Sequence, residues 1–368
     1  MRLTVEKNNI LKALSHAQSV VEKRHTLPIL GHVLLHAEGD SITLHSTDME
    51  LNLVEKVNAV VEEPGLLTVS AAMFFDIMRK LGDDTVRLFV KDNQLHIHAG
   101  RSKFKISYLN ADDFPKLTFG DLPITFSLKT ETLKKLFDKP RFAMATEETR
   151  YYLNGIYWHT IPGENLLRAV ATDAHRLAFT QIPAPEGSID MPGVIISRKT
   201  VNEVRKLLDE EGGDVIVKLS PQRIEFHFAT SSLSSRLIDG NFPDYLQAIP
   251  SNNNRIFYVP TKDYMSAVDR VATVVSDKIR VIKLELKENL VTVSALSSEL
   301  GSAVEELSVA YDSQENVEIG FNAKYLLDIT QHIDEEETEV YLSDGNSPAL
   351  MRGAGNTESV YVLMPMRM

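Results

Sequence analysis

Residues 3–14 read LTVEKNNILKAL. Apolar and polar residues alternate at the start of this stretch, and Ile10, Ala13 and Leu14 then follow at helical spacing. Alternation is typical of a half-buried strand, whereas the later spacing is typical of an amphipathic helix. The stretch therefore predicts a strand that runs directly into a helix.

This strand–helix pattern occurs three times along the chain without gaps, starting at Leu3, Phe126 and Phe257. In the second and third copies, Thr130 and Thr261 stand where a helix N-cap is expected. The matching apolar positions are Val5, Leu128 and Val259, then Ile10, Leu133 and Tyr264, then Ala13, Leu136 and Ala267, and finally Leu14, Phe137 and Val268. Such repetition indicates that the chain is built from copies of one structural unit.

A second strand–helix pattern repeats in the same order, starting at Val69, Ile196 and Phe321. Each copy continues with a residue that commonly caps a helix and ends on an apolar residue followed by proline. The capping residues are Ser70, Ser197 and Asn322, and the closing pairs are Phe114-Pro115, Phe242-Pro243 and Met364-Pro365. Short apolar runs bounded by turn residues predict strands between the helices. We therefore expect an α+β fold of three repeated domains, residues 1–122, 123–250 and 251–368, each with two helices packed on antiparallel sheets.

The composition excludes several classes of protein. Hydrophobic residues make up 43% of the 368 residues, which is too many for a disordered chain. There is no cysteine, so a disulfide scaffold, a thiolate zinc site and a cysteine nucleophile are excluded. No apolar run approaches the roughly 18 residues that a membrane span needs, and the first residues show no secretory signal. We expect a soluble, cytoplasmic protein with no membrane partner and no cofactor.

The charge is unevenly distributed along the chain. The net charge of −12, taken alone, argues against a nucleic-acid partner. The six expected helices with their flanks nevertheless contain 20 Lys and Arg against 9 Asp and Glu, so they carry +11 and the remainder carries −23. These segments are residues 7–24, 71–81, 129–142, 198–208, 261–280 and 322–333. A positive face on an acidic body would suit a polyanion held at one surface, although Lys-rich surface helices also serve solubility.

Motifs for catalysis or metal binding are weak. His96 and His98 lie on one face of a predicted strand, but no third ligand follows at a suitable spacing, so a packing or surface role is favoured over a metal pair. Asp173 and His175 could support acid–base chemistry, yet no nucleophile or partner carboxylate accompanies them, which favours a binding or structural role. The acidic run at residues 334–337 is expected to be a solvated loop.

Two other features suit binding. Arg150-Tyr151-Tyr152 combines a cation with two aromatic rings, a pairing that can hold phosphate and stack on bases, although paired tyrosines are more often core residues. Residues 362–368 are apolar apart from Arg367, whereas most chain ends are polar and frayed. Such an end must be buried or must line a groove for a partner, and methionine suits surfaces that bind several partners.

The sequence resembles the bacterial sliding clamp family, the beta subunits of DNA polymerase III, over its whole length. The stretches that carry the resemblance are TLPILG at residues 26–31, RYYLNG at 150–155, ATDAHRLA at 171–178, DGNFPDY at 239–245 and MPMR at 364–367. The resemblance implies a non-enzymatic processivity subunit. It also implies a head-to-tail homodimer, a closed ring of six domains that encircles double-stranded DNA independently of sequence.

The resemblance further implies which residues act and which partners they meet. The residues expected to contact DNA are Arg24, Arg150, Tyr151, Tyr152, Arg198 and Lys199. Those expected at the dimer interface are Phe104, Ile106, Thr273 and Val274. A pocket for short linear motifs is expected from Leu153, Thr172, Ala174, His175, Arg176, Leu177, Pro243, Ala248, Val362, Leu363, Met364, Pro365 and Met366, with Ala174 replacing a usual glycine. Its expected partners are the replicative polymerase, the clamp loader, and other polymerases and repair proteins.

Two alternatives make different predictions. A hydrolase that uses Asp173 and His175 would lose activity on substitution of His175 while its fold stays intact. A repeat scaffold with no DNA role would show no salt-dependent association with DNA.

Overall fold

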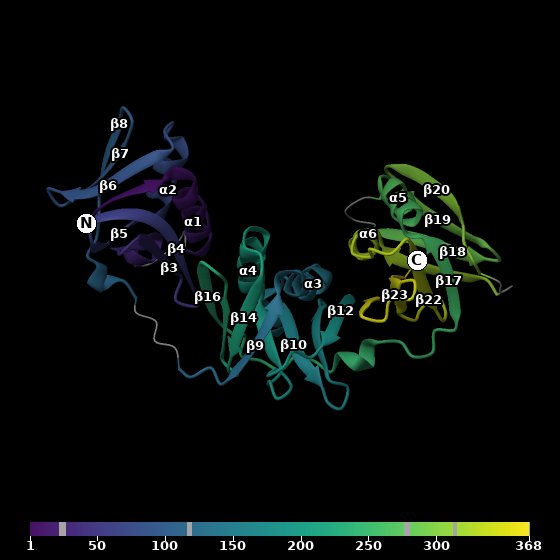
Figure 1. Ribbon diagram of the computed structural model, residues 1–368. Helices are drawn as coiled ribbons and strands as arrows, with labels where there is room; N and C mark the ends of the chain where they lie inside the picture. Colours follow the sequence, from purple (N-terminus) through teal and green to yellow (C-terminus); the bar gives the residue numbers. More distant parts are fainter. Residues whose placement is uncertain (22–26, 116–119, 276–279, 312–314, 368) are drawn as a thin grey trace. The chain divides into compact units, whose positions relative to one another are not determined.

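The computed structural model describes residues 1–21, 27–115, 120–275, 280–311 and 315–367. Within these ranges, each of the three repeats begins with a strand that runs directly into a helix (Figure 1). These pairs are β1 (Arg2–Glu6) and α1 (Lys7–Val20), β9 (Ile124–Lys129) and α3 (Thr130–Arg141), and β17 (Arg255–Pro260) and α5 (Thr261–Ala272). All the apolar positions aligned from the sequence are buried. The predicted strand–helix repeat is therefore confirmed.

The second strand–helix pattern is confirmed as well. Its copies are β5 (Gly65–Ser70) and α2 (Ala71–Lys80), β13 (Val194–Ser197) and α4 (Arg198–Glu210), and β21 (Val317–Asn322) and α6 (Ala323–Thr330). Within its own repeat, α1 packs against α2, and α5 packs against α6.

The remaining strands fill the intervals between these helices. In the first repeat they are β2 (His32–Glu38), β3 (Ser41–Thr47), β4 (Leu51–Glu63), β6 (Thr85–Lys91), β7 (Gln94–Ala99) and β8 (Ser102–Ser107). In the second they are β10 (Gly155–Ile161), β11 (Leu166–Thr172), β12 (Arg176–Pro183), β14 (Asp214–Leu219), β15 (Arg223–His227) and β16 (Ser231–Arg236). In the third they are β18 (Val281–Lys287), β19 (Leu290–Ser297), β20 (Gly301–Ser308), β22 (Glu337–Leu342), β23 (Ala349–Gly353) and β24 (Ser359–Leu363). Short 3₁₀ turns are η1 (Pro28–Gly31), η2 (Ala111–Asp113), η3 (Glu148–Leu153) and η4 (Tyr245–Ala248).

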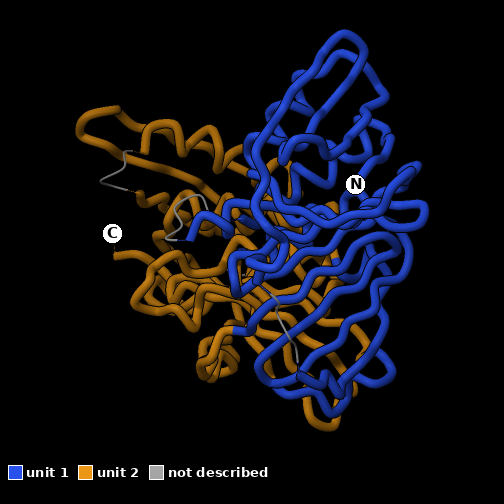
Figure 2. Tube along the Cα trace, turned by 90° about the vertical axis from the view of Figure 1, so that its left-hand side faces the viewer, with its two compact units in different colours: residues 1–133, 185–192, 199–237 blue, residues 134–184, 193–198, 238–368 orange. Residues whose placement is uncertain are grey.

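Antiparallel sheets continue from one repeat into the next. β4 of the first repeat pairs with β16 of the second, with Leu53 opposite Leu233. β12 of the second pairs with β24 of the third, with Leu177 opposite Val362. The chain accordingly divides into two compact units (Figure 2), which share the middle repeat: residues 1–133, 185–192 and 199–237 form unit 1, and residues 134–184, 193–198 and 238–368 form unit 2.

Two of the expected helix caps are confirmed and two are wrong. Asn322 accepts hydrogen bonds from the amides of Lys324 and Tyr325, and the Ser70 hydroxyl accepts one from Met73. Thr130 and Thr261 are instead the first residues of their helices. Their hydroxyls bond across the fold, Thr130 to the carbonyl of Gly213 at 2.9 Å and Thr261 to the hydroxyl of Thr338.

Within residues 261–280, the segment expected to contain a helix and its flanks, the helix is α5. α5 ends at Ala272, where the β-branched residues Thr273, Val274 and Val275 begin. Such residues lose side-chain freedom in a helix, and the Thr273 hydroxyl bonds instead to the carbonyl of Arg270 at 2.7 Å. Among the described helices, none is both long and apolar enough to cross a membrane.

Candidate functional site

The β11–β12 hairpin carries the centre of the predicted partner pocket. Asp173 closes its turn, because its Oδ1 accepts hydrogen bonds from the amides of His175 and Arg176, both at 3.0 Å. The Thr172 hydroxyl donates to the carbonyl of Arg176 at 2.7 Å. Ala174 has a φ of 73°, a left-handed conformation in which Cβ crowds the next carbonyl. The turn thereby presents Ala174 and His175 to solvent.

The C-terminal segment lies beside this turn. β24 pairs with β12, and the Met364 amide then donates to the carbonyl of His175 at 2.9 Å. The chain is buried as far as Leu363, whereas Met364 and Pro365 are half-buried and Met366 is exposed. The apolar chain end is thus partly built into the sheet and partly accessible.

Buried apolar side chains form a cluster beneath the turn and the C-terminal segment. The cluster consists of Val170, Leu177, Phe179, Tyr245, Val360 and Val362. Ala248 of η4 packs against this cluster, and Pro243 is exposed just before η4. Leu153 is buried, so it contributes packing rather than accessible surface. The structure therefore brings together most of the pocket residues named from the sequence.

Arg176 differs from the other predicted pocket residues because its side chain points into the protein. Its guanidinium is paired with Asp173 and Asp328 and donates to the carbonyl of Phe142 at 2.7 Å. It also lies 4.2 Å from the centre of the Tyr325 ring. Arg176 is only 8% exposed, which makes it a support for the pocket rather than part of its open face.

Sequence reasoning missed the residues of α6 that complete this region. The Tyr325 ring stacks near the His175 imidazole with the ring centres 6.3 Å apart, and Asp328 pairs with Arg176. Both lie in a helix 150 residues away in sequence, and the helical pattern alone could not indicate which strand they face.

The tyrosine pair predicted to contact DNA lies in η3. Tyr151 is 53% exposed, and its ring meets that of Tyr152 edge to face at 5.8 Å. Arg150 is half-buried, with its Nε 3.7 Å from a carboxylate oxygen of Glu147. The exposed ring of Tyr151 argues against the alternative that both tyrosines are core residues.

Arg198 begins α4 close to η3. Its amide donates to the carbonyl of Asn154 at 2.9 Å, and its guanidinium donates to the carbonyls of Met144 and Ala145. Burial lowers the pKa of Arg198, although arginine stays charged in proteins. Arg198 therefore braces the loop that leads into the Arg150-Tyr151-Tyr152 motif.

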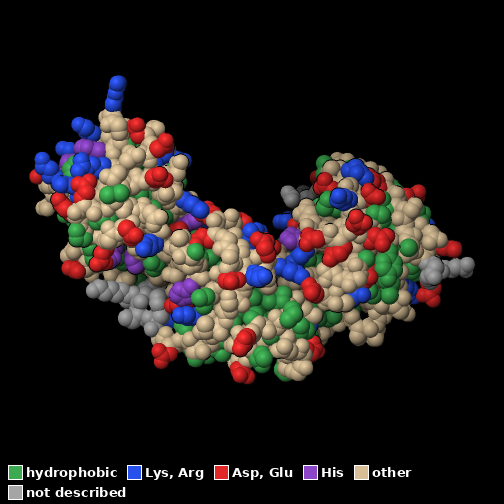
Figure 3. Space-filling view, in the orientation of Figure 1, with side chains coloured by type: hydrophobic (Ala, Val, Ile, Leu, Met, Phe, Trp, Pro, Cys, Tyr) green, Lys and Arg blue, Asp and Glu red, His purple; other side chains and the backbone are tan. Residues whose placement is uncertain are grey.

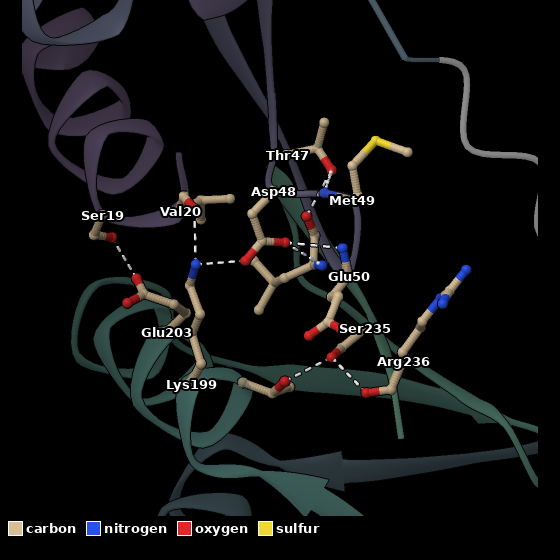
Figure 4. A network of polar contacts seen from close by, with 12 residues as sticks. Ser19, Val20, Thr47, Asp48, Met49, Glu50, Lys199, Glu203, Ser235 and Arg236 are labelled. Atoms are coloured by element: carbon tan, nitrogen blue, oxygen red, sulfur yellow. Dashed lines mark hydrogen bonds and ion pairs between the residues drawn. The ribbon is translucent and has the colours of Figure 1, made fainter. Parts of the chain in front are cut away.

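Lys199 is held in place by unit 1 (Figure 4). Its ammonium group donates to the carbonyl of Val20 at 3.0 Å and pairs with Asp48. Nearby, the Ser19 hydroxyl donates to Glu203. Arg24, another predicted DNA contact, lies outside the described residues.

The helices are less basic than their expected extents suggested. With the observed bounds they contain 15 Lys and Arg against 9 Asp and Glu, a net charge of +6 rather than +11. The difference arises because flanking cations such as Lys129 and Arg280 lie beyond the helix ends. Acidic and basic side chains are interspersed on the face shown in Figure 3, and several helix cations are ion-paired, such as Lys12 with Glu210.

The residues expected at the dimer interface lie on or near accessible edges of the fold. Phe104 and Ile106 belong to β8, an edge strand, and Phe104 is 38% exposed while Ile106 is buried. Thr273 is exposed and Val274 is half-buried directly after α5. β20 is one of the two edge strands of the four-stranded sheet. Edge strands offer unpaired backbone groups to a second chain.

The structure gives no catalytic role to the candidate acid–base pair. The Asp173 carboxylate is engaged by the turn amides and by Arg176, so it does not orient the His175 imidazole. His96 and His98 share one face as predicted, and both rings pack on Phe89 at 4.9 Å. In the part of the chain that the structure describes, no group of three His, Cys, Asp or Glu residues could hold a metal ion.

The acidic run is only partly a free loop. Asp334 pairs with Lys139 at 2.8 Å, Glu335 accepts a hydrogen bond from Asn356, and Glu337 begins β22. The expected solvation holds for Asp334, Glu336 and Glu337, which are exposed, whereas Glu335 is half-buried.

Comparison with known proteins gives a match over the whole chain. Three family models match in succession: the N-terminal domain of the DNA polymerase III beta subunit over residues 1–118, its central domain over 127–244 and its C-terminal domain over 246–367. Curated beta sliding clamps are similar over the full length of both chains, at 45% identity in Caulobacter vibrioides, 39% in Pseudomonas aeruginosa and 35% in Escherichia coli.

Solved structures agree with the sequence matches. A sliding clamp from Bartonella birtlesii, bound to griselimycin, has a TM-score of 0.96 at 42% identity, with all of both chains covered. The clamp of Caulobacter crescentus has a TM-score of 0.95 at 44% identity, with 100% of this chain and 99% of that chain covered. The chain belongs to the DNA polymerase III beta subunit family, the beta sliding clamps, and is a DNA sliding clamp that tethers the polymerase rather than an enzyme.

Proposed function

We propose that two copies of this chain join head to tail through β8 of one copy and the region of β20 and α5 of the other, and that the resulting ring encircles duplex DNA. The observation that carries the proposal is the match of all three family domains, in order, along a single chain. A two-fold ring uses the same pair of surfaces twice. Phe104, Ile106, Thr273 and Val274 are the proposed interface residues. We propose domain boundaries near Leu122 and Pro250.

A ring holds DNA by topology, so its contacts can be weak and independent of sequence. Contacts to phosphate carry no sequence information, and this permits sliding. We assign such contacts to Arg24, Arg150, Tyr151, Tyr152, Arg198 and Lys199. The exposure of Tyr151 supports this role best, whereas Lys199 must first leave Asp48 and Val20 to reach a phosphate. A polymerase tethered in this way meets its template at high effective concentration.

The second element of the proposal is a peptide pocket formed by the β11–β12 turn, η4 and the C-terminal segment. Apolar anchors of a linear motif would occupy the surface over the buried cluster, between Leu177, Ala248 and Met364. The proposed partners are the replicative polymerase, the clamp loader, and other polymerases and repair proteins. These partners act on chromosomal DNA, and we propose a cytoplasmic location.

Removal of residues 364–368 tests the pocket. The deletion removes the amide that bonds to His175 together with the accessible methionines, while β24 keeps its pairing with β12. We expect binding of a polymerase-motif peptide, measured by calorimetry, to be lost. The dimer, measured by solution mass, should persist because the deletion leaves β8 and β20 intact. Unchanged peptide affinity would refute the pocket assignment.

A further inference from the structure

The segment that connects the second repeat to the third lies on one face of the eight-stranded sheet in unit 2. The Phe242 ring stacks on Tyr157 of β10 with the ring centres 4.8 Å apart and an interplanar angle of 7°. Tyr245 is 6% exposed and belongs to the buried cluster with Leu177 and Val362. Ala248 and Pro243, both proposed pocket residues, flank Tyr245 in this segment. The position of Tyr245 therefore determines the position of the pocket wall that Pro243 and Ala248 form.

The Tyr245 hydroxyl is bonded from two strands at once. Arg168 of β11 donates to it from Nη1 at 3.0 Å, and His159 of β10 lies with its Nε2 2.9 Å away. Arg168 is itself fixed, because two of its nitrogens donate to the Gln181 side-chain oxygen at 3.0 and 2.6 Å, and because its guanidinium stacks 4.3 Å over the Phe179 ring. A fixed donor gives the hydroxyl a defined position.

The hydrogen bonds also fix the tautomer of His159. Its Nδ1 lies 3.1 Å from the carbonyl oxygen of Thr160, which can only accept, so Nδ1 carries the proton. Nε2 of the neutral ring is then an acceptor, and the Tyr245 hydroxyl donates to it. Arg168 therefore donates a hydrogen bond to the Tyr245 hydroxyl, and this hydroxyl donates one to His159. Protonation of Nε2 would remove this acceptor and place a second cation beside Arg168.

The charged and titratable groups around this imidazole come from β10, β11 and the η4 segment. They are Arg168 from β11, Tyr245 from η4 with Asp244 next to it, and Tyr157, which stacks on the ring from the same strand at 4.9 Å. Burial lowers the pKa of His159, and the charge of Arg168 acts in the same direction, against the bond to Thr160. At neutral pH the network is therefore complete.

We propose that Tyr245, Arg168 and His159 are positioning residues for the peptide pocket: by fixing η4 on the sheet, they set the distance between the Pro243 and Ala248 wall and the Leu177 and Val362 floor. This inference rests on the proposed pocket. It assigns a role to Tyr245, Arg168 and His159, which are not themselves pocket-lining residues because their polar atoms lie behind the Pro243 and Ala248 wall.

The substitution Tyr245→Phe tests the proposal, since it keeps the ring and removes only the hydroxyl. We expect the affinity for a synthetic peptide with the polymerase clamp-binding motif to fall about fivefold to tenfold at pH 7.5. As the pH is lowered through the pKa of His159, with protonation followed by the NMR shifts of its ring protons, wild-type binding should weaken, so the wild-type to variant affinity ratio should fall towards one. Both proteins retain His175, so its contribution to binding cancels in the ratio.

Tyr311→Phe is the matched control. Tyr311 is 4% exposed, lies between β20 and β21 and donates to the carbonyl of Glu315 at 2.8 Å, and it is not a member of the cluster beneath the pocket. Its loss should reduce stability without changing peptide affinity. Equal affinities of wild type and Tyr245→Phe, or a ratio that stays constant while His159 becomes protonated, would overturn the positioning role. Failure of wild type to bind the peptide would instead overturn the pocket itself. Hydrogen exchange of the amides at residues 245–249 tests the positioning without peptide, and unchanged exchange in Tyr245→Phe would also overturn it.

Discussion

Arg176 shows how one side chain can support a binding surface from behind. Its guanidinium is paired with Asp173 and Asp328 and packs on the Tyr325 ring, so it joins β12 to α6. Loss of one partner of a buried ion pair is strongly destabilising because the other charge stays buried. The motif at residues 171–178 identified the position of Arg176, but only the fold decides whether a long side chain there turns outward or inward.

Ala174 carries strain at the centre of the pocket turn. Its φ of 73° costs an alanine more than a glycine. We expect Ala174→Gly to raise the free energy of unfolding by about 0.5–1 kcal/mol, measured by denaturant titration.

Ala303 provides the matched control for this substitution. It lies within strand β20, where φ is not positive, and glycine there is expected to lower stability by about 0.5–1 kcal/mol. A destabilising Ala174→Gly would show that the turn is not strained.

At the scale of elements, His16 joins three segments of unit 1. From α1, its Nδ1 lies 2.9 Å from Glu55 of β4 and its Nε2 lies 3.2 Å from Glu210 of α4. Burial would lower the pKa of His16, but the hydrogen bonds and charges of Glu55 and Glu210 outweigh burial and raise it. The His16 imidazole therefore binds its second proton more tightly in the native state than in the unfolded chain.

The sign of the resulting pH dependence follows from linkage. The His16 contribution is fully present below the unfolded pKa of about 6.5 and is lost as the pH rises through the higher native pKa. We expect the Tm difference between wild type and His16→Gln to be larger near pH 6 than near pH 9 in thermal unfolding. His36→Gln is the control, because His36 is less buried than His16 and lies 3.5 Å from a single carboxylate, that of Glu38. A difference that grows with pH would contradict the assignment.

The elements themselves were largely predictable from the sequence, and their pairing was not. Local periodicity sufficed for the strand–helix starts at Leu3, Phe126 and Phe257. The caps at Thr130 and Thr261 were wrong because each hydroxyl found a partner remote in sequence. Likewise, the pairing of β4 with β16 joins strands that are about 180 residues apart, and no local pattern encodes such a contact. The pocket residues were found through motif resemblance, whereas Tyr245, Arg168 and Tyr325 required the fold.

At the scale of the whole molecule, the distribution of charge is more informative than the net charge. The net charge of −12 combines helices of +6 with an acidic remainder. Many of the described helix cations are ion-paired, such as Lys12, Lys139 and Arg205. Weak attraction suits a protein whose hold on DNA is topological, because tight phosphate contacts would oppose sliding.

Retention on DNA of different topology tests the ring most directly. The clamp would be placed by the clamp loader of the same organism on nicked circular DNA, and the bound fraction measured by gel filtration before and after the circle is cut once. We predict that the protein stays on the circle and leaves the linear DNA over its free ends. Equal retention on both forms would contradict topological tethering and point to direct binding instead.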